Sequence, residues 1–440
     1  MAFSLHGVHL PHRKNTANTA AVRMDAPKTV AIPMGMHIGA PSTPAVKVGD
    51  HVDIGTLIAQ QNGTISVPVH SSVSGTVKAI ELRMQSNGQK APVIVIESDG
   101  ANTVDPAIAA PKVTNREELI DAIRQSGIVG LGGAGFPTYV KFNADPAKIE
   151  ELVINGAECE PYITSDSLTM THRADDMAYA LSVLETHLGI KKVIIGIENN
   201  KKEAIAKMKE LAAKDPCVKV VSLPAVYPQG GEKVLVYHTT GKVIPVGKLP
   251  LDVGCVVCNC TTLASIGAYL KTGMPLVEKC ITVDGSAVQE PKNVIVPIGT
   301  AMEEVFAFCG GFKEEPGKVI YGGPMMGVAV ADLTAPVLKN TNAILAFNQK
   351  DADPGVETAC IRCGNCYNHC PFGINPSALE RAYKAGDLKA MERLGADACM
   401  ECGCCAYICP ANRPLVQTNK LAKTALREAR AAAKEKEARN

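Results

Sequence analysis

Two short cysteine-rich boxes constrain the fold of this chain more than any other feature. The first, CIRCGNCYNHCP, runs over residues 360–371, and the second, CMECGCCAYICP, over residues 399–410. Together they hold nine of the 16 cysteines of the chain. Each has the spacing C-x2-C-x2-C-x3-C-P, in which three cysteines wrap one cuboidal cluster and the fourth reaches the other cluster. The spacing therefore predicts two [4Fe–4S] clusters with crossed ligation.

Crossed ligation assigns to each cluster three cysteines of one box and the last cysteine of the other. We expect the first cluster to be held by Cys360, Cys363, Cys366 and Cys409, and the second by Cys399, Cys402, Cys405 and Cys370. Zinc is the alternative, but it needs two CxxC pairs or Cys/His pairs per ion, which these boxes fit poorly. Cys404 lies outside the pattern and is expected to be a packing thiol. Two clusters imply one-electron transfer, so electrons must enter elsewhere in the chain.

Length and composition place the boxes in a chain of several domains. At 440 residues the chain is too long for one core, so we expect two to four domains. A net charge of +1 gives no electrostatic footprint for nucleic acid. The N-terminal stretch is broken by His, Pro and charged residues and does not read as a secretory signal. We therefore expect a reducing compartment, where thiolates bind metal more often than they form disulfides.

The N-terminal region has the pattern of a β-domain. Residues 1–28 look like a loose arm, and residues 29–112 follow as the first domain. Within it, residues 46–60 and 67–80 alternate apolar and polar side chains. The pattern resembles the barrel-sandwich fold of lipoyl and biotinyl carrier domains. Because the corresponding hairpin, residues 61–67, has no modifiable lysine, we predict a carrier-like fold used for docking.

Strands and helices alternate in the middle of the chain. Residues 113–253 are predicted to form an α/β domain with a largely parallel sheet. Residues 254–353 are expected to hold a small β-grasp-like module and its connection, and residues 354–416 the cluster domain. Residues 417–440, rich in Ala, Lys and Glu, predict a charged helix that is either a frayed tail or a partner-binding element.

A glycine-rich loop, GLGGAGFPTYVKF, covers residues 130–142. Its glycines allow backbone N–H groups to approach an anion closely, and Lys141 follows on the next predicted helix. A tight turn would need the same glycines, so the loop alone is weak evidence. A second string, NGAECEP, ends a predicted strand and carries Glu158 and Glu160, with Asp166 soon after. At strand ends of an α/β sheet such carboxylates face the ligand crevice, where they suit ribose or ribityl hydroxyls and a nicotinamide amide.

Two more strings make the arrangement recognisable. YPQGGEKVLVYHTTG (227–241) and NCTTLASIGAYLKTG (259–273) join the first two in an order and spacing that resemble the FMN- and NADH-binding subunit of respiratory complex I. With GGPMMG (322–327) and the two cysteine boxes, the chain is more similar to the RnfC family of the Rnf ion-translocating ferredoxin:NAD oxidoreductase complexes. The resemblance covers about residues 30–416.

The resemblance implies a multidomain α/β fold. Its parts are an N-terminal barrel-sandwich hybrid β-domain, a Rossmann-like FMN/NADH-binding α/β domain, a small soluble-ligand-binding β-grasp (SLBB-like) domain and a C-terminal dicluster ferredoxin-like helical domain. It also implies residue roles. FMN would be lined by Gly132, Gly133, Gly135, Lys141, Asn155 and Asn259. The NADH side would be bounded by Phe136, Glu158, Glu160 and Glu232, with Glu158 and Glu160 as the expected catalytic residues. The cofactor-binding set is completed by Ala134, Asp166, Tyr227, Gly230 and Thr261.

One position departs from the family pattern. Complex I has paired glutamates where this chain has Gly231 and Glu232, so the nucleotide contact is expected to differ. The resemblance implies hydride exchange between NAD(H) and FMN, followed by single-electron transfer through two [4Fe–4S] clusters. Two other interpretations stay open: an electron-relay and docking subunit with a degenerate nucleotide site, and a soluble flavin dehydrogenase or hydrogenase subunit.

The resemblance also implies partners and a location. The expected partners are NAD(H) and the other Rnf subunits, including a ferredoxin-like iron–sulfur subunit and integral membrane subunits. The expected location is the cytoplasmic face of the cell membrane, as a peripheral protein.

Overall fold

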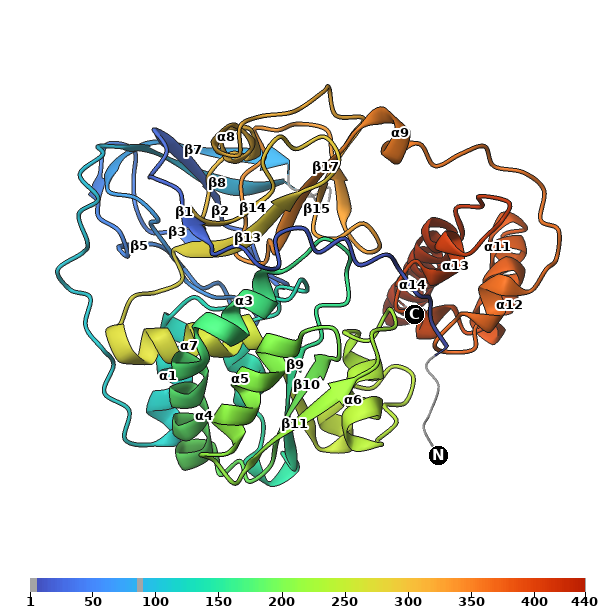
Figure 1. The fold of residues 1–440 in the computed structure, drawn as a ribbon, viewed down its shortest axis with the longest axis horizontal. Coiled ribbons are helices and arrows are strands. Elements are labelled where there is room, and N and C mark those ends of the chain that lie inside the picture. The colour runs from blue at the N-terminus through green and yellow to red at the C-terminus, as the bar shows by residue number, and fades with distance from the viewer. Residues whose placement is uncertain (1–5, 85–89, 440) are drawn as a thin grey trace.

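The computed structural model describes residues 6–84 and 90–439. Figure 1 shows the α/β domain and two β-rich domains stacked as one large body, with a smaller helical domain beside it. The described N-terminal segment starts near the helical domain and then crosses this body between its two tiers.

The first β-domain consists of two small antiparallel sheets around an aliphatic core. One sheet has the order β2 (Thr29–Pro33), β8 (Lys90–Ser98), β7 (Gly75–Met84), β4 (His51–Val52). The other has the order β3 (Thr43–Pro44), β5 (Leu57–Gln60), β6 (Val69–His70). Val30, Ile58 and Ile94 are fully buried between them. The predicted hairpin tip contacts the next domain, because the Tyr139 hydroxyl donates a hydrogen bond to the Thr64 carbonyl.

The α/β domain is built on a four-stranded parallel sheet. The strand order is β11 (Val218–Leu223), β10 (Val193–Glu198), β9 (Glu151–Gly156), β12 (Cys255–Asn259). Its helices are α1 (Arg116–Gln125), α2 (Thr138–Phe142), α3 (Ser165–His172), α4 (Ala174–Leu188), α5 (Lys202–Ala212), α6 (Glu232–Thr240) and α7 (Cys260–Thr272). All six residues of β10 are buried, as expected for a strand covered on both faces.

The predicted boundary at residues 253/254 is wrong. Strand β12 pairs with β9 in the α/β sheet, and helix α7 follows β12 directly. The third domain therefore starts after α7. Its six-stranded sheet has the order β1 (Val22–Arg23), β14 (Lys292–Pro297), β13 (Glu278–Asp284), β17 (Ala343–Phe347), β15 (Lys318–Tyr321), β16 (Val328–Val330). Helices α8 (Met302–Phe308) and α9 (Gln349–Ala352) complete it.

The N-terminal arm is not loose over its described part. Val8 is buried and pairs with Tyr227 of the α/β domain. Thr16 is fully buried, and strand β1 of the arm pairs in parallel with β14 of the third domain. Residues 1–5 of the predicted arm lie outside the described residues. The arm thus joins two domains that lie far from it in the sequence.

The C-terminal domain is helical. It contains α10 (Asn365–Asn368), α11 (Pro376–Lys384), α12 (Leu388–Arg393), α13 (Cys404–Tyr407) and α14 (Leu415–Arg439). Helix α14 begins before the predicted residue 417, and its buried Leu415, Ala422 and Leu426 pack inside the domain. The first half of the tail is therefore part of the cluster domain.

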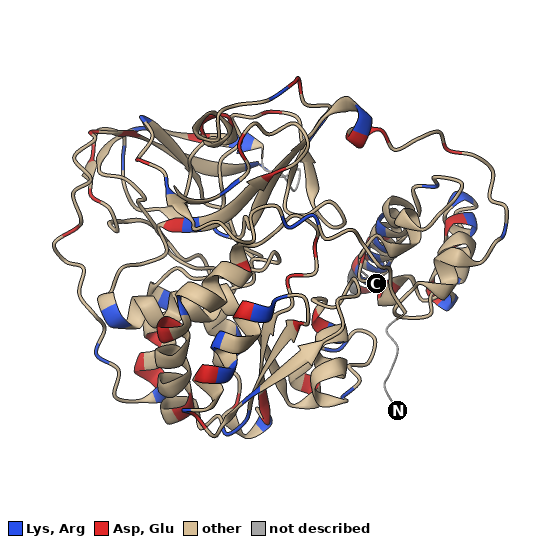
Figure 2. Cartoon of the chain, in the orientation of Figure 1, with Lys and Arg blue, Asp and Glu red and all other residues tan. Residues whose placement is uncertain are grey.

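Acidic and basic residues are mixed on the helices of the chain. Figure 2 shows acidic and basic residues interspersed along the helices of the α/β and C-terminal domains. This agrees with the net charge of +1. None of the helices within residues 6–84 and 90–439 combines the length and the apolar character needed to cross a membrane.

Candidate functional site

The candidate site lies at the carboxyl ends of the neighbouring parallel strands β9 and β12. Asn155, the next-to-last residue of β9, and Asn259, the last residue of β12, lie side by side as partners in the strand register. The Asn155 side chain donates to the Gly230 carbonyl at 2.9 Å and accepts from the Ala157 N–H at 3.2 Å. The Asn259 side chain accepts the Thr261 N–H at 2.9 Å and so caps helix α7. Both residues fix the loops around the crevice in which ligands of α/β sheets bind.

The glycine loop passes close to this edge of the sheet. The Leu131 N–H donates to the Thr262 hydroxyl at 2.9 Å, which ties the loop to α7. A Cβ at Gly132 would lie 3.0 Å from the Asn259 side-chain nitrogen, so a larger residue there would crowd Asn259. This close approach is the structural reason for glycine at residue 132.

The tip of the loop is open and is held from two other domains. Gly133 and Gly135 have φ values of 131° and 63°, where glycine is favoured. Their carbonyls accept hydrogen bonds from the Asn340 side chain at 2.7 Å and the Ile38 N–H at 3.0 Å. Gly133 and Ala134 are exposed. An exposed glycine backbone held in a fixed shape fits the cradle expected for the phosphate of a flavin nucleotide.

Lys141 and Glu232 are brought together from separate elements. The Lys141 ammonium in α2 donates to the Val257 carbonyl at 3.1 Å and lies 3.5 Å from the Glu232 carboxylate at the start of α6. Both side chains are partly exposed, at 30% and 44%, so this ion pair adds little stability and leaves the lysine available to an anion. Lys141, expected beside the phosphate, and Glu232, expected beside the nucleotide, thus lie at the same side of the site.

Glu158 and Glu160 do not continue the strand, because β9 ends at Gly156. Glu158 has a positive φ of 47°, so the two side chains do not project in parallel. Its Oε1 accepts the Asp166 N–H of α3 at 2.6 Å. Its Oε2 is buried and has no hydrogen-bond partner among the described residues. Burial raises the pKa of Glu158 to about 7, while Lys14 opposes this shift.

Glu160 binds the loop GGPMMG of the third domain. Its carboxylate accepts the N–H groups of Met325 at 3.0 Å and Met326 at 2.9 Å. A Cβ at Gly323 would lie 2.3 Å from Glu160 Oε2, which explains the glycine in that loop. Burial raises the pKa of Glu160 to about 7. Glu160 therefore connects the strand end to the third domain in addition to lying at the site.

Asp166 and Thr261 bond to each other. The Thr261 hydroxyl donates to Asp166 Oδ1 at 2.6 Å, and the Asn259 side chain donates to Asp166 Oδ2 at 2.7 Å. Both Asp166 and Thr261 are buried. In the structure their hydrogen bonds hold α3 against the start of α7, so the two residues support the site and do not line it.

Tyr227 and Gly231 meet the second cysteine box. The buried Tyr227 hydroxyl donates to the Cys402 carbonyl at 2.7 Å. A Cβ at Gly231 would lie 2.3 Å from the Met400 methyl group. The departure from paired glutamates therefore has a physical reason, because Met400 fills the space that a side chain at residue 231 would need. Phe136 is half-buried beside the loop, with its carbonyl accepting the Gly130 N–H at 2.8 Å.

The eight predicted cluster ligands line two cavities. One cavity includes Cys370, Cys399, Cys402 and Cys405 in its lining. The other includes Cys360, Cys363, Cys366 and Cys409. Each cavity thus includes the three predicted ligands of one box and the last cysteine of the other, and four thiols are the donor set of a [4Fe–4S] cluster. Cys404 also lines the second-box cavity.

The second-box cavity is the one that adjoins the α/β domain. Cys402 and Cys404 pack together with Tyr227, Val8 and Leu10 in one small hydrophobic core. Cys404, expected to be a packing thiol, has this role here: its Sγ lies 3.9 Å from the Tyr227 carbonyl. By contrast, the cysteines 360 and 363 of the first box are exposed. The two cavities therefore differ in position, one facing the candidate site and one facing solvent.

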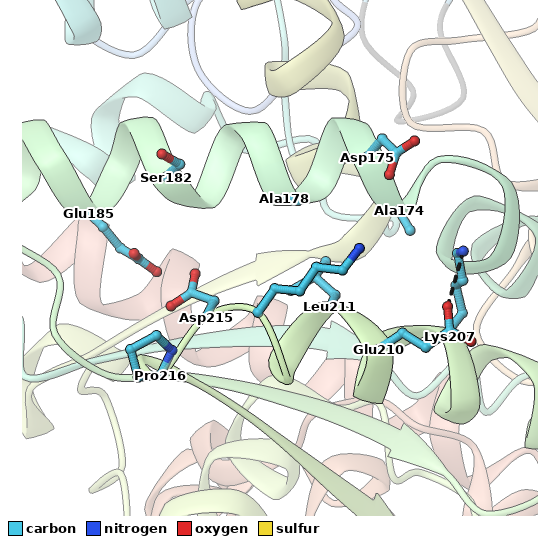
Figure 3. A pocket seen from close by; sticks show the side chains of 11 residues that line it. Ala174, Asp175, Ala178, Ser182, Glu185, Lys207, Glu210, Leu211, Asp215 and Pro216 are labelled. Carbon is cyan, nitrogen blue, oxygen red and sulfur yellow. Dashed lines mark hydrogen bonds and ion pairs between the residues drawn. The ribbon is translucent and has the colours of Figure 1, made fainter.

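Two features were not anticipated from sequence. The first is Lys14 of the arm, whose ammonium donates to carbonyls of residues 158–163. The second is a cavity between α4 and α5 (Figure 3), where Glu185 and Asp215 point toward each other. Ligand atoms of Glu185, Asp215 and Cys217 lie within 4.8 Å of one another. Burial and then Asp215 raise the pKa of Glu185 to about 7. Neither feature has a local sequence signal.

Four family models match the chain in the predicted order. They are the RnfC barrel sandwich hybrid domain (residues 3–101), the Nuo51 FMN-binding domain (123–268), the SLBB domain (280–329) and a 4Fe-4S dicluster domain (356–410). The predicted fold class is thereby confirmed. In fold, the chain is similar to the NAD+-reducing [NiFe]-hydrogenase in the air-oxidized state, with a TM-score of 0.50 and 20% identity, covering 66% of this chain and 58% of that chain.

Curated relatives match most of the chain. The RnfC protein of the Na(+)-translocating ferredoxin:NAD(+) oxidoreductase complex of Acetobacterium woodii is 43% identical, over 84% of this chain and 85% of the relative. Its counterpart in the proton-translocating complex of Clostridium ljungdahlii is 41% identical, over 85% and 82%. The counterpart in the ion-translocating oxidoreductase complex of Rhodobacter capsulatus is 38% identical, over 97% and 84%. From this similarity along the whole domain series, the chain belongs to the RnfC family of ion-translocating oxidoreductase complexes.

Proposed function

We propose that this chain is the NAD(H)-linked electron-transfer subunit of an ion-translocating ferredoxin:NAD oxidoreductase complex. The observation that carries the proposal is the direct contact between the strand-end site and the second cysteine box, through Tyr227 and Cys402. A site for a flavin and a site for a cluster that share a buried contact suit transfer of electrons between them. FMN, when bound, supplies the conversion between two-electron hydride chemistry and one-electron transfer.

The flavin phosphate would be held by the glycine loop and Lys141. The loop exposes its backbone, and its carbonyls at residues 133 and 135 already accept hydrogen bonds from other domains. Lys141 adds a cation, whose ion pair with Glu232 is weak at 3.5 Å. Asn155 and Asn259 would bound the other side of the flavin, because they lie side by side at the carboxyl ends of β9 and β12, the two strands that form the floor of the site.

The nicotinamide nucleotide would be contacted by Glu158. Its buried Oε2 has no partner among the described residues, so it can accept a hydrogen bond from a ligand hydroxyl or amide. Phe136 and Glu232 would line the entrance. Glu160 is occupied by the loop of residues 325–326, so we assign it to a supporting role.

Single electrons would pass through two [4Fe–4S] clusters in the two cysteine-lined cavities. The second-box cluster would be nearer the flavin, and the first-box cluster, with Cys360 and Cys363 exposed, would face a partner. The partners are the other subunits of the complex, among them a ferredoxin-like iron–sulfur subunit and integral membrane subunits. The chain would lie at the cytoplasmic face of the membrane.

Anaerobic purification tests the proposal. We expect about eight irons and one FMN per chain, and bleaching of the flavin band on addition of NADH. A second candidate function, an electron relay with a degenerate nucleotide site, is favoured by the Met400 side chain that fills the space beside Gly231. A protein that holds both clusters and FMN but whose flavin does not respond to NADH would support the relay and contradict NAD(H) chemistry here.

A further inference from the structure

The N-terminal arm places one lysine against the backbone of the carboxylate loop, residues 157–163. The Lys14 ammonium donates to the carbonyls of Glu158 at 3.0 Å, Glu160 at 2.8 Å and Ile163 at 2.5 Å. An ammonium group has three N–H donors, so these three acceptors use all of them. The lysine is therefore fully committed to this loop.

The arm is anchored on both sides of Lys14. The His12 carbonyl accepts the Tyr162 N–H at 2.9 Å, and the Thr16 and Thr164 hydroxyls are 2.6 Å apart. Both anchors are made to the same loop or to the residue that follows it. The position of Lys14 is thus set by contacts that do not depend on its own charge.

The carboxylate loop needs an external support. Glu158 and Tyr162 have positive φ values of 47° and 69°, a region that non-glycine residues rarely adopt. The turn makes three carbonyl oxygens converge on one point, where their dipoles repel one another. A cation at that point offsets the repulsion, and a hydrogen bond to a charged group is stronger than one to a neutral donor.

We propose that Lys14 is a positioning residue that holds the carboxylate loop in the shape needed to bind the nicotinamide nucleotide. Through this loop it fixes the direction of Glu158 toward the site and of Glu160 toward the third domain. The inference deepens the proposed function, since it concerns how that site binds its nucleotide.

The charge of Lys14 gives the arrangement a pH dependence. Burial lowers the pKa of Lys14 to about 8; the groups around it are Glu158 and Cys159 on the loop, Glu198 at the end of β10 and Lys201 just before α5. Above pH 8 the neutral amine keeps two donors for three carbonyls. The loop should then loosen, and the apparent affinity for NADH should fall as the pH rises from 8 to 9.

Hydrogen–deuterium exchange and NADH titration of the holoprotein test the proposal. In Lys14→Met we expect amide exchange in residues 158–163 to rise about tenfold and the KM for NADH to rise about tenfold. FMN and iron should be retained, and the KM for NADH should stay constant between pH 8 and 9. Lys28→Met, an exposed lysine farther along the arm, is the matched control and should behave like the unchanged protein.

A second variant covers the case in which Lys14→Met does not fold. Lys14→Arg keeps a cation that does not titrate, so loop protection should persist at pH 9, where the unchanged protein loses it. Equal loop exchange in Lys14→Met and Lys28→Met, or the same loss of protection at pH 9 in Lys14→Arg and the unchanged protein, would overturn the inference. The exchange measurement needs no NADH, so it separates failure of this inference from failure of the proposed function.

Discussion

The Tyr227 hydroxyl donates a hydrogen bond to the backbone carbonyl of Cys402 at 2.7 Å, and both residues are buried. Tyr227 precedes helix α6 of the α/β domain, and Cys402 is a predicted ligand in the second cysteine box. One hydrogen bond therefore joins the candidate flavin site to the cavity that would hold the nearer cluster. The distance between two redox groups controls the rate of electron transfer between them. Removing the Tyr227–Cys402 hydrogen bond therefore tests whether this contact affects that rate.

The Tyr227→Phe variant should slow electron transfer from flavin to cluster. The change keeps the ring and leaves the Cys402 carbonyl unpaired, at a cost of about 1–3 kcal/mol. In anaerobic stopped-flow experiments, NADH should bleach the flavin at the normal rate while cluster bleaching is delayed. Tyr179→Phe, at an exposed tyrosine of α4, is the matched control. Equal delays in both variants, or none in either, would argue against a specific role for the Tyr227 hydroxyl.

Cys370 tests the crossed ligation. It is the last cysteine of the first box but lines the cavity of the second-box cysteines. Cys370→Ala should reduce iron from about eight toward four atoms per chain and remove the EPR signal of the second-box cluster. Cys404→Ala, which replaces a buried thiol outside the ligand pattern, should keep the full iron content. Loss of the first-box signal in Cys370→Ala would show that each box holds its own cluster.

Lys141 tests the flavin site. Lys141→Ala should weaken FMN binding by about 1.5–3 kcal/mol, because a charge-assisted phosphate contact is lost. FMN released on dialysis can be measured by its fluorescence. The exposed Lys148 provides the control substitution, Lys148→Ala. If Lys141→Ala retains all its FMN after dialysis, the phosphate lies elsewhere.

The sequence was most informative where chemistry imposes spacing. The cysteine boxes predicted which thiols share a cavity, and the strand-end motif predicted that Asn155 lies near the carboxyl end of its strand. The sequence was less informative where pairing between distant segments decides to which domain a strand belongs. Nothing local in residues 255–259 distinguishes a strand of the α/β sheet from one of the next domain, since only the partner β9 makes the difference.

The arm and the carboxylate loop were missed for related reasons. The arm has no periodicity because its partners lie in different domains, as in the pairing of Val8 with Tyr227 of the α/β domain and of strand β1 with β14 of the third domain. The two glutamates were both expected to face the ligand crevice from the strand end, but β9 ends at Gly156 and Glu158 has φ of 47°. Backbone turns without glycine leave little trace in a single sequence.

The acidic pair of the α4–α5 cavity should make stability depend on pH. The pKa of Glu185 in the folded chain is raised to about 7 from 4.5. The folded state therefore holds a proton that the unfolded state has lost, and the associated stabilisation is complete below about pH 4.5 and is lost as the pH rises through 7. Glu185→Gln should raise the Tm at pH 8 and change it little at pH 5. The control Glu203→Gln, exposed on α5, should show no such contrast, and a Glu185→Gln shift that is the same at both pH values would contradict the assignment.

Glu158 and Glu160 should separate into two roles. Glu158 has a buried oxygen free to accept from a ligand, so Glu158→Gln should raise the KM for NADH several-fold with FMN and iron unchanged. Glu160 instead accepts two backbone N–H groups of the loop at residues 325–326. A glutamine there offers one acceptor and turns an NH2 group toward a backbone N–H, so Glu160→Gln should loosen that loop.

The Met325 side of this loop packs against the second cysteine box, where its carbonyl would lie 2.9 Å from a Cβ at Gly403. Glu160→Gln should therefore delay cluster reduction more than it raises the KM for NADH. Stopped-flow traces at flavin and cluster wavelengths, recorded over a range of NADH concentrations, measure both quantities in each variant. An equal rise in KM in the two variants, without any delay at the clusters, would assign both carboxylates to the nucleotide. An unchanged NADH dependence in the double variant would move the nucleotide away from this loop.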